Sequence, residues 1–459
     1  MGYSMPRTSQ FPNATLDVDV SPEYLGVGYV IGPRIAGTMF AGGVLSWLVL
    51  LPLLTILGRY INVPFPPIHP NYANNPATGM PFLISEMSPA QLWSAYIRYI
   101  GAGAVLASGL ITLARTIPTI ISSAREGMRD FASAGGGVAR VRTERDIPMT
   151  VVIVGSLLLA VFLMAIPSLP TFGNPLAAIL ILIFGFFFAT VSSRITGLIG
   201  TSSNPISGMT IATLILTCLL FVALGWTGDM YSPIAIGVGA IVCIAAANAG
   251  NTSQDLKTGY IVGATPLYQQ IGLVIGVIAS ASVIGLTLLY LHNNLGGIGS
   301  QNLAAPQATL MSTIIRGLLS QNLPWGLVLV GVFISVVLEL CGVRSLSFAV
   351  GSYLPIATTA PIFAGGIVRW WVEQRTGNKN ESEISSGTLF SSGLIAGGSL
   401  AGILYAGLFG RNLLAAADDG ATTGVIPFLH EGLVGTLAGA LLFFALAVIV
   451  GRVGMRKLE

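Results

Sequence analysis

Apolar stretches long enough to cross a bilayer recur along the whole chain. A membrane-spanning helix needs roughly 20 apolar residues, and eleven candidate stretches are present. They cover 24–57, 93–114, 148–166, 175–193, 208–225, 233–250, 267–291, 323–341, 346–371, 387–409 and 433–451. A segment in lipid must satisfy its backbone polar groups internally, which favours helices for runs of this length. We therefore predict an all-α, polytopic transmembrane helix bundle.

The composition points the same way. Only 8% of the 459 residues are charged and 53% are hydrophobic, whereas soluble domains carry roughly 25% charged residues. The three cysteines, Cys218, Cys243 and Cys341, are scattered through apolar runs without metal-ligand spacing. We expect a multi-pass membrane protein surrounded by lipid, with no metal site, no cofactor and no nucleic-acid partner.

Basic residues predict the orientation in the membrane. The segment 115–147 carries six arginines, and the C-terminus ends in Arg452, Arg456 and Lys457. Both should be cytoplasmic by the positive-inside rule. The loop 58–92 then lies outside, and a polar tail, residues 1–20, precedes the first span.

An internal repeat links the two ends of the chain. The stretch 25-LGVGYVIGPRIAGTMFAGGVLSW-47 matches 348-FAVGSYLPIATTAPIFAGGIVRW-370, and Val27 matches Val350 at an offset of 323 positions (350 − 27). The basic segment follows the first copy, and further basic residues precede the helix after the second. The two copies should therefore have opposite orientations, which is typical of secondary transporters with inverted-topology repeats. We expect repeat regions at 21–170 and 343–459, with central helices at 171–342.

If successive spans simply alternate in direction across the membrane, the second copy does not reach the side of the membrane that the opposite orientation requires. One central segment should therefore be re-entrant, broken or miscounted, and the polar stretches 200–210 and 254–270 are the candidates. Irregular backbone at membrane depth is tolerated only where it is buried in protein or lines a water-filled cavity.

The first polar stretch contains the motif 204-NPISGMT-210. Pro205 removes a backbone donor, and Gly208 permits unusual dihedral angles. A helix that begins near Ile206 would present free N–H groups and a positive dipole end, which can hold a carboxylate. We predict that Asn204, Ser207 and Gly208 bind substrate. An ordinary N-cap in a cytoplasmic loop is the alternative.

The second polar stretch is 251-NTSQDLKTGYIVGATPLYQQIG-272. Asp255 is a candidate proton carrier, although a charge at the edge of a span is often an ordinary loop residue. The paired amides of Gln269 and Gln270 must find partners inside a bundle. We expect them to line the substrate cavity together with Tyr353.

Isolated charges provide two further candidates. Arg34 precedes a long apolar run and suits a substrate carboxylate, while Glu339 lies near the end of another. An ionisable residue in a membrane is a functional candidate because leaving it in lipid costs roughly 2.5–3.5 kcal/mol. Glu339 is the candidate for proton coupling; the alternative is an interfacial pair with Arg344. Motifs of metalloproteases, serine hydrolases and P-loop enzymes are absent, so we expect no enzymatic activity.

The motifs NPISGMT and QDLKTGYIVGATP resemble those of the oligopeptide transporter (OPT) family, specifically its prokaryotic members. The resemblance includes SPEYLGVGYVIGPRIAG and FAVGSYLPIATTAPIFAGGIVRWWVE and covers the chain from Ser21. It implies a secondary, proton-coupled importer of small peptides in a bacterial or archaeal cytoplasmic (inner) membrane, working by alternating access. A related branch, the yellow stripe-like proteins, implies metal–chelate uptake instead. A passive pore or membrane scaffold is the rival from another class.

Members of that family usually have additional transmembrane helices before the region that matches residues 21–57. The chain starts almost directly at this region. A natural short form, a mis-assigned start and half of a split system all remain open, so the expected partners include a second copy or a protein that supplies the N-terminal helices.

Overall fold

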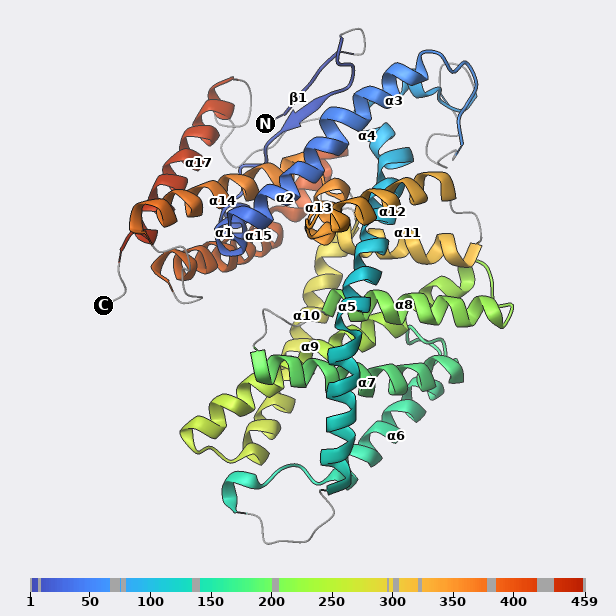
Figure 1. Cartoon of the computed structure of the whole chain (residues 1–459), viewed down its shortest axis with the longest axis vertical. Coiled ribbons are helices and arrows are strands. Elements are labelled where there is room, and N and C mark those ends of the chain that lie inside the picture. Colours follow the sequence, from blue (N-terminus) through green and yellow to red (C-terminus); the bar gives the residue numbers. More distant parts are fainter. Residues whose placement is uncertain are drawn as a thin grey trace. The chain divides into compact units, whose positions relative to one another are not determined.

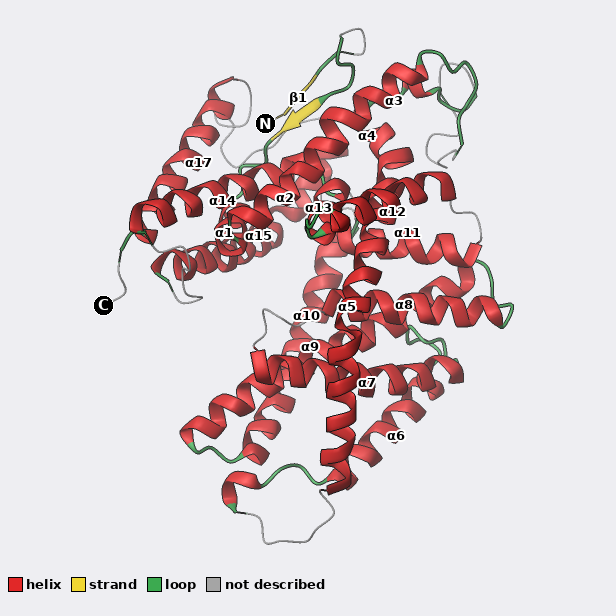
Figure 2. Cartoon of the chain, in the orientation of Figure 1, coloured by secondary structure: helices red, strands yellow, loops and turns green. Residues whose placement is uncertain are grey.

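The computed structural model describes residues 2–6, 10–66, 75, 80–133, 141–199, 206–294, 297–299, 305–320, 324–377, 385–418 and 433–456. Helices dominate these residues, and the two short strands of one hairpin are the only strands among them (Figure 2). Eight of the described helices are long and apolar enough to cross a membrane, and two shorter apolar helices accompany them. The predicted all-α polytopic bundle is confirmed.

The chain forms two compact units, which are described separately. Unit 1 comprises residues 1–108, 290–306 and 324–459, and unit 2 comprises 109–289 and 307–323. The units are interleaved along the sequence.

Unit 1 contains both repeat copies, and each forms two helices separated by a break (Figure 1). The first consists of α1 (Pro22–Ile31) and α2 (Pro33–Val44), and the second of α13 (Ser345–Tyr353) and α14 (Ile356–Thr376). Gly32 separates the first pair with a φ of 84°, a conformation that favours glycine. Pro355 occupies the matching position of the second copy, where it is the N-cap of α14. Two different residues thus break the helix at equivalent positions.

The two copies pack against each other reciprocally. A Cβ on Gly28 of α1 would overlap the carbonyl of Ile362 on α14; at the equivalent positions, a Cβ on Gly351 of α13 would overlap the carbonyl of Met39 on α2. Two further glycines, at equivalent positions of the two copies, make contacts of the same kind. A Cβ on Gly42 would overlap the carbonyl of Phe348, and one on Gly365 would overlap the carbonyl of Leu25. Because each of these four contacts maps onto another under the 323-residue offset, the copies are related by a local, approximate two-fold axis.

Further helices of unit 1 surround this pair. After α2, a π-helical segment (Leu45–Leu50) leads into α3 (Leu51–Gly58). The 3-10 turn Ile84–Glu86, α4 (Pro89–Leu92) and the π-helical segment Trp93–Ile97 lead into α5 (Arg98–Ser133). The remaining helices are α12 (Trp325–Leu340), α15 (Ser386–Asp418) and α17 (Leu433–Gly454).

Glycines also bring α5 close to α12. A Cβ on Gly103 would overlap the carbonyl of Val328, and one on Gly331 would overlap that of Ile100. Small residues at such crossings allow backbones in lipid to gain dispersion contacts. Helices α5 and α12 therefore pack closely at these glycines.

The N-terminal tail is anchored on unit 1. Strand β1 (Gly2–Ser4) pairs antiparallel with β2 (Thr15–Asp17). In the connection, Asn13 has a φ of 61° and is 2% exposed. Its amide donates to Thr55 Oγ1 at 3.0 Å and to the Met87 carbonyl at 3.3 Å. A segment expected only to be a polar tail therefore inserts a buried amide between two elements.

Unit 2 is built mainly from α6 (Met149–Ala165), α7 (Pro175–Ile199), α8 (Ile206–Ala223), α9 (Ser232–Val262), most of α10 (Pro266–Asn294) and most of α11 (Pro306–Ser320). Helix α7 packs along α9, and the buried hydroxyl of Ser192 donates to the Ala246 carbonyl between them. The core of this unit is apolar, with aliphatic side chains from α7, α8, α9 and α11.

Two segments of unit 2 differ from the sequence expectation. Helix α9 continues through residues 251–262, beyond the expected span 233–250, so the break within the stretch 254–270 lies at residues 263–265. The stretch is the end of one helix and the start of the next, joined at Gly263 with a φ of 73°. Helix α5 likewise continues to Ser133, through much of the basic segment 115–147. Arginine, glutamate, methionine and alanine are good helix formers, so a helix need not end where its hydropathy falls.

Candidate functional site

Tyr353 is the predicted site residue with the most distinctive environment. It ends α13, directly before the break, and only 3% of it is exposed. Its ring lies 5.9 Å from that of Trp93, centroid to centroid. The hydroxyl is buried and has no hydrogen-bond partner within the described structure. A buried hydroxyl without a partner is unusual in a folded protein.

The surroundings of Tyr353 contain groups that the sequence analysis did not single out. The buried Trp93 Nε1 also has no hydrogen-bond partner among the described residues. Arg98 is close enough to act electrostatically on the Tyr353 phenol. Trp47 stacks on Trp93 with a centroid distance of 6.2 Å. Unit 1 thus brings two indole rings, a phenol and a guanidinium together beside a helix break.

The ends of the first helices of both repeat copies are capped by side chains from the opposite copy. Ser46 Oγ donates to the Ser352 carbonyl at 2.8 Å, near the C-terminal end of α13. Arg369 occupies the position equivalent to Ser46, and its Nη1 donates to the Val30 carbonyl at 2.8 Å and the Tyr29 carbonyl at 3.2 Å. Carbonyls at a helix C-terminus lack intrahelical donors. The reciprocal caps therefore supply hydrogen-bond donors to backbone carbonyls at both breaks.

Arg34 is exposed in the first turn of α2, directly after the Gly32 break. The described hydrogen bond of this residue is through its backbone, where the carbonyl accepts from Thr38 Oγ1 at 2.8 Å. The structure thus places Arg34 at the break of the first copy, whereas Tyr353 lies at the break of the second.

Glu339 caps the N-terminus of α13. Its Oε1 accepts from both the backbone N–H and the hydroxyl of Ser345, each at 2.8 Å. A carboxylate at this position satisfies an orphan donor and interacts favourably with the positive end of the helix dipole. Glu339, a residue of α12, therefore contacts the start of α13, and Tyr353 lies at the end of α13.

In unit 2, Asp255 and Gln269 lie together. Gln269 Nε2 donates to the Asp255 carbonyl at 3.2 Å, and its side chain packs against Gly259. Both residues line an open groove of about 540 Å³ between α9 and α10, with Thr258 and Ser280 as further polar members. The Asp255 carboxylate is on an exposed residue, so the groove combines a carboxylate, an amide and hydroxyls on otherwise apolar helices.

Gln270 faces a different partner from Gln269. Its Oε1 accepts from the Ile147 backbone N–H at 3.0 Å, and its Nε2 donates to Asp146 Oδ1 at 3.2 Å. Leu267 N also donates to the Arg145 carbonyl at 2.8 Å. Gln270 therefore joins the start of α10 to the segment before α6.

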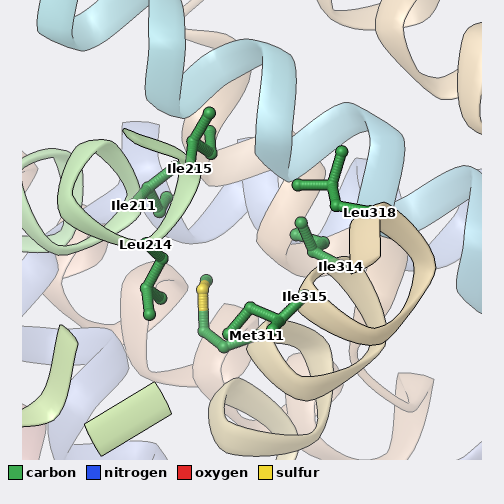
Figure 3. Close-up of a pocket in the computed structure, with 7 residues that line it drawn as sticks. All are labelled: Ile211, Leu214, Ile215, Met311, Ile314, Ile315 and Leu318. Carbon is green, nitrogen blue, oxygen red and sulfur yellow. The ribbon is translucent and has the colours of Figure 1, made fainter. Parts of the chain in front are cut away.

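The NPISGMT motif is described only in part. Asn204 lies outside the described residues, as does the side chain of Ser207, whereas Gly208 is buried in the first turn of α8. Farther along α8, a void of about 10 Å³ lies between this helix and α11. Figure 3 shows that its lining side chains contain only carbon and the sulfur of Met311. Such a void has room for about one water molecule and offers it no polar partner.

The sequence pattern of the OPT oligopeptide transporter protein family matches residues 4–409. The chain belongs to the OPT family. This family consists of transporters, not of enzymes. Together with the apolar helices, membership identifies an integral, multi-pass membrane protein.

Relatives of this OPT chain carry two kinds of name. A candidate oligopeptide transporter of Haemophilus influenzae is 28% identical over 88% of this chain and 68% of its own length. Two rice proteins (Oryza sativa subsp. japonica), YSL11 and YSL14, are named as candidate metal-nicotianamine transporters. They are 23% and 24% identical, over 85% and 83% of this chain. The chain spans 57% and 54% of their lengths.

Sequence reasoning missed Trp93, Arg98, Ser46 and Arg369. One signal could have found Arg98, because it lies inside the expected span 93–114 and an ionisable residue within a span is a functional candidate. The roles of Ser46 and Arg369 could not be predicted from the sequence, because each side chain donates to a carbonyl more than 300 positions away in the chain. Among the described residues, no group of three or more His, Cys, Asp or Glu side chains could hold a metal ion.

Proposed function

We propose that this OPT chain is a secondary, proton-coupled transporter that imports small oligopeptides by alternating access across a bacterial or archaeal cytoplasmic membrane. The observation that carries the proposal is the reciprocal packing of two helix–break–helix copies around a local two-fold axis. Transporters with repeats related in this way form substrate sites from broken helices at the repeat interface.

The breaks provide the parts that such a site needs. Irregular backbone at the ends of α1 and α13 is held by side chains of the opposite copy rather than exposed to lipid. Tyr353 lies at one break and Arg34 at the other. Substrate would contact these residues of unit 1. The candidate substrate contacts of unit 2 are Gln269, Gln270 and the NPISGMT residues Asn204, Ser207 and Gly208.

Proton coupling would act through Glu339. Its carboxylate accepts two hydrogen bonds at the start of α13. Protonation removes the negative charge and one acceptor site, and so weakens the interaction with the helix dipole. Because Tyr353 ends the same helix, protonation and substrate contact could shift one common element. Asp255, in the polar groove of unit 2, is the second candidate for carrying the proton.

A metal–chelate substrate is the second candidate, favoured by the names of the two rice relatives. Chelates of this kind resemble modified peptides with several carboxylates and amines. The higher identity to the Haemophilus protein favours peptides.

The test is uptake by proteoliposomes under an imposed proton gradient. A labelled tripeptide and an iron chelate are compared, with a pH-sensitive dye inside. Accumulation of peptide with acidification of the lumen supports the proposal, and accumulation of chelate alone assigns the second candidate. Downhill flux that ignores the gradient would instead indicate a passive pore. The absence of flux with well-folded protein would contradict transport by this chain alone and would call for a partner or a second copy.

A further inference from the structure

We propose that Tyr353, Trp93 and Arg98 form an anchor for a carboxylate group of the substrate. The inference rests on the proposed transport of peptides or peptide-like chelates and assigns the carboxylate a site. It adds Trp93 and Arg98 to the residues expected from the sequence.

The first observation is a pair of buried donors without acceptors. Tyr353 is 97% buried (3% exposed), yet neither its hydroxyl nor the buried Trp93 Nε1 has a hydrogen-bond partner in the described part of the chain. The two rings lie 5.9 Å apart with an interplanar angle of 57°. Since buried polar groups are nearly always hydrogen-bonded, two orphans in adjacent side chains indicate a partner that the described residues do not supply.

The chemistry of the group defines that partner. An indole N–H can only donate, a guanidinium can only donate, and a phenol hydroxyl can donate. Arg98 adds positive charge, and its electrostatic effect reaches the Tyr353 phenol. The group therefore offers two donors without acceptors beside a cation, and an acceptor with negative charge suits it. A carboxylate has two acceptor oxygens and no donor.

Packing holds the anchor in place. Trp47 stacks on Trp93 at an interplanar angle of 21°, and Trp47 Nε1 donates to the Leu354 carbonyl at the break. A Cβ on Gly101 would lie 3.0 Å from the Tyr353 Cα, so α5 approaches this backbone closely. Donors fixed by their neighbours lose little conformational entropy when a ligand binds. The Tyr353 and Trp93 side chains are thus held in place before a ligand binds.

The anchor predicts discrimination between a peptide acid and its amide. Binding of a tripeptide and of its C-terminal amide is measured by calorimetry on the purified full chain, for the wild type, Tyr353→Phe and Trp93→Phe. Each substitution keeps an aromatic ring and removes one donor. We expect each to weaken binding of the acid roughly tenfold or more, because hydrogen bonds to a charged group are the strong ones. Binding of the amide should change much less.

Tyr96→Phe is the matched control. Tyr96 is a buried tyrosine in the π-helical segment that also contains Trp93, and its hydroxyl already donates to the Phe65 carbonyl at 2.8 Å. This variant should leave the acid-to-amide ratio unchanged. Size-exclusion chromatography and thermal unfolding establish that each variant is folded. An unchanged ratio in folded Tyr353→Phe and Trp93→Phe would overturn the anchor while leaving peptide transport intact.

A second measurement separates the anchor from the proposed function. Glutarate, a simple dicarboxylate, is titrated in a thermal-shift assay against glutaramide. Stabilisation of the wild type by glutarate, lost in Tyr353→Phe and retained in Tyr96→Phe, supports the anchor even where no peptide is transported. Equal stabilisation of the wild type and Tyr353→Phe, or none in either, counts against it.

Discussion

Phe40 and Phe363 stack face to face, with ring centroids 4.6 Å apart and an interplanar angle of 1°. They are the same position of the two repeat copies, since 363 − 40 equals the offset of 323. A contact between equivalent residues lies on the axis that relates the copies. The local two-fold therefore passes through this aromatic pair, between α2 and α14.

The two-fold relation predicts paired effects of substitution. Gly28→Ala and Gly351→Ala should each lower the free energy of unfolding by about 1–3 kcal/mol, because the new methyl group overlaps a backbone carbonyl and must displace a helix. Thermal unfolding in detergent measures both. Gly397→Ala, on an exposed face of α15 with open space around it, is the control. A large loss in one variant and none in its equivalent would argue against reciprocal packing.

The reciprocal caps should differ in strength. Arg369→Gln removes charged hydrogen bonds to the Tyr29 and Val30 carbonyls and the ion pair with Glu373, whereas Ser46→Ala removes neutral hydrogen bonds near the end of α13. We expect losses of about 1.5–3 kcal/mol and about 0.5–1.5 kcal/mol, respectively. Equilibrium unfolding of both variants gives the comparison. Glu373→Gln removes the ion pair alone, so a loss equal to that of Arg369→Gln would show that the caps contribute nothing.

Asn13 should stabilise unit 1 through its buried amide. Asn13→Gly keeps the left-handed backbone conformation and removes the hydrogen bonds to Thr55 and Met87, which should cost about 1–3 kcal/mol. Asn13→Ala should cost roughly 1 kcal/mol more, because a side chain with Cβ disfavours a φ of 61°. Melting temperatures of the two variants separate the contributions. If both melt like the wild type, the amide is not holding the tail.

Glu339 joins a structural role to the proposed proton coupling. Glu339→Gln keeps an acceptor for Ser345 but removes the charge, so we expect a modest loss of stability, about 0.5–1 kcal/mol. Uptake by this variant should no longer respond to the imposed proton gradient. Ser345→Ala leaves the carboxylate in place and should keep the response. Retained proton dependence in folded Glu339→Gln would limit Glu339 to its capping role and leave Asp255 as the candidate.

The candidate residues show where prediction from sequence stops. Tyr353 was expected to line the substrate cavity, and the structure places it at a helix break. Gln269 and Gln270 were expected to act together, but their side chains bond to different segments, at Asp255 and at residues 146–147. Adjacent positions on a helix point about 100° apart, so their partners depend on which elements pack there.

The sequence by itself determined the class of protein, the multi-pass helical architecture and the existence of two related copies. Hydropathy and self-similarity are properties of the chain and require no knowledge of contacts. Only the tertiary structure decided where the breaks lie among the described residues, that the copies pack as a reciprocal pair and that Arg369 and Ser46 cap each other's repeat. Those features depend on contacts between residues more than 300 positions apart. In lipid, close packing of small residues decides such contacts, and apolar composition is nearly the same on every face.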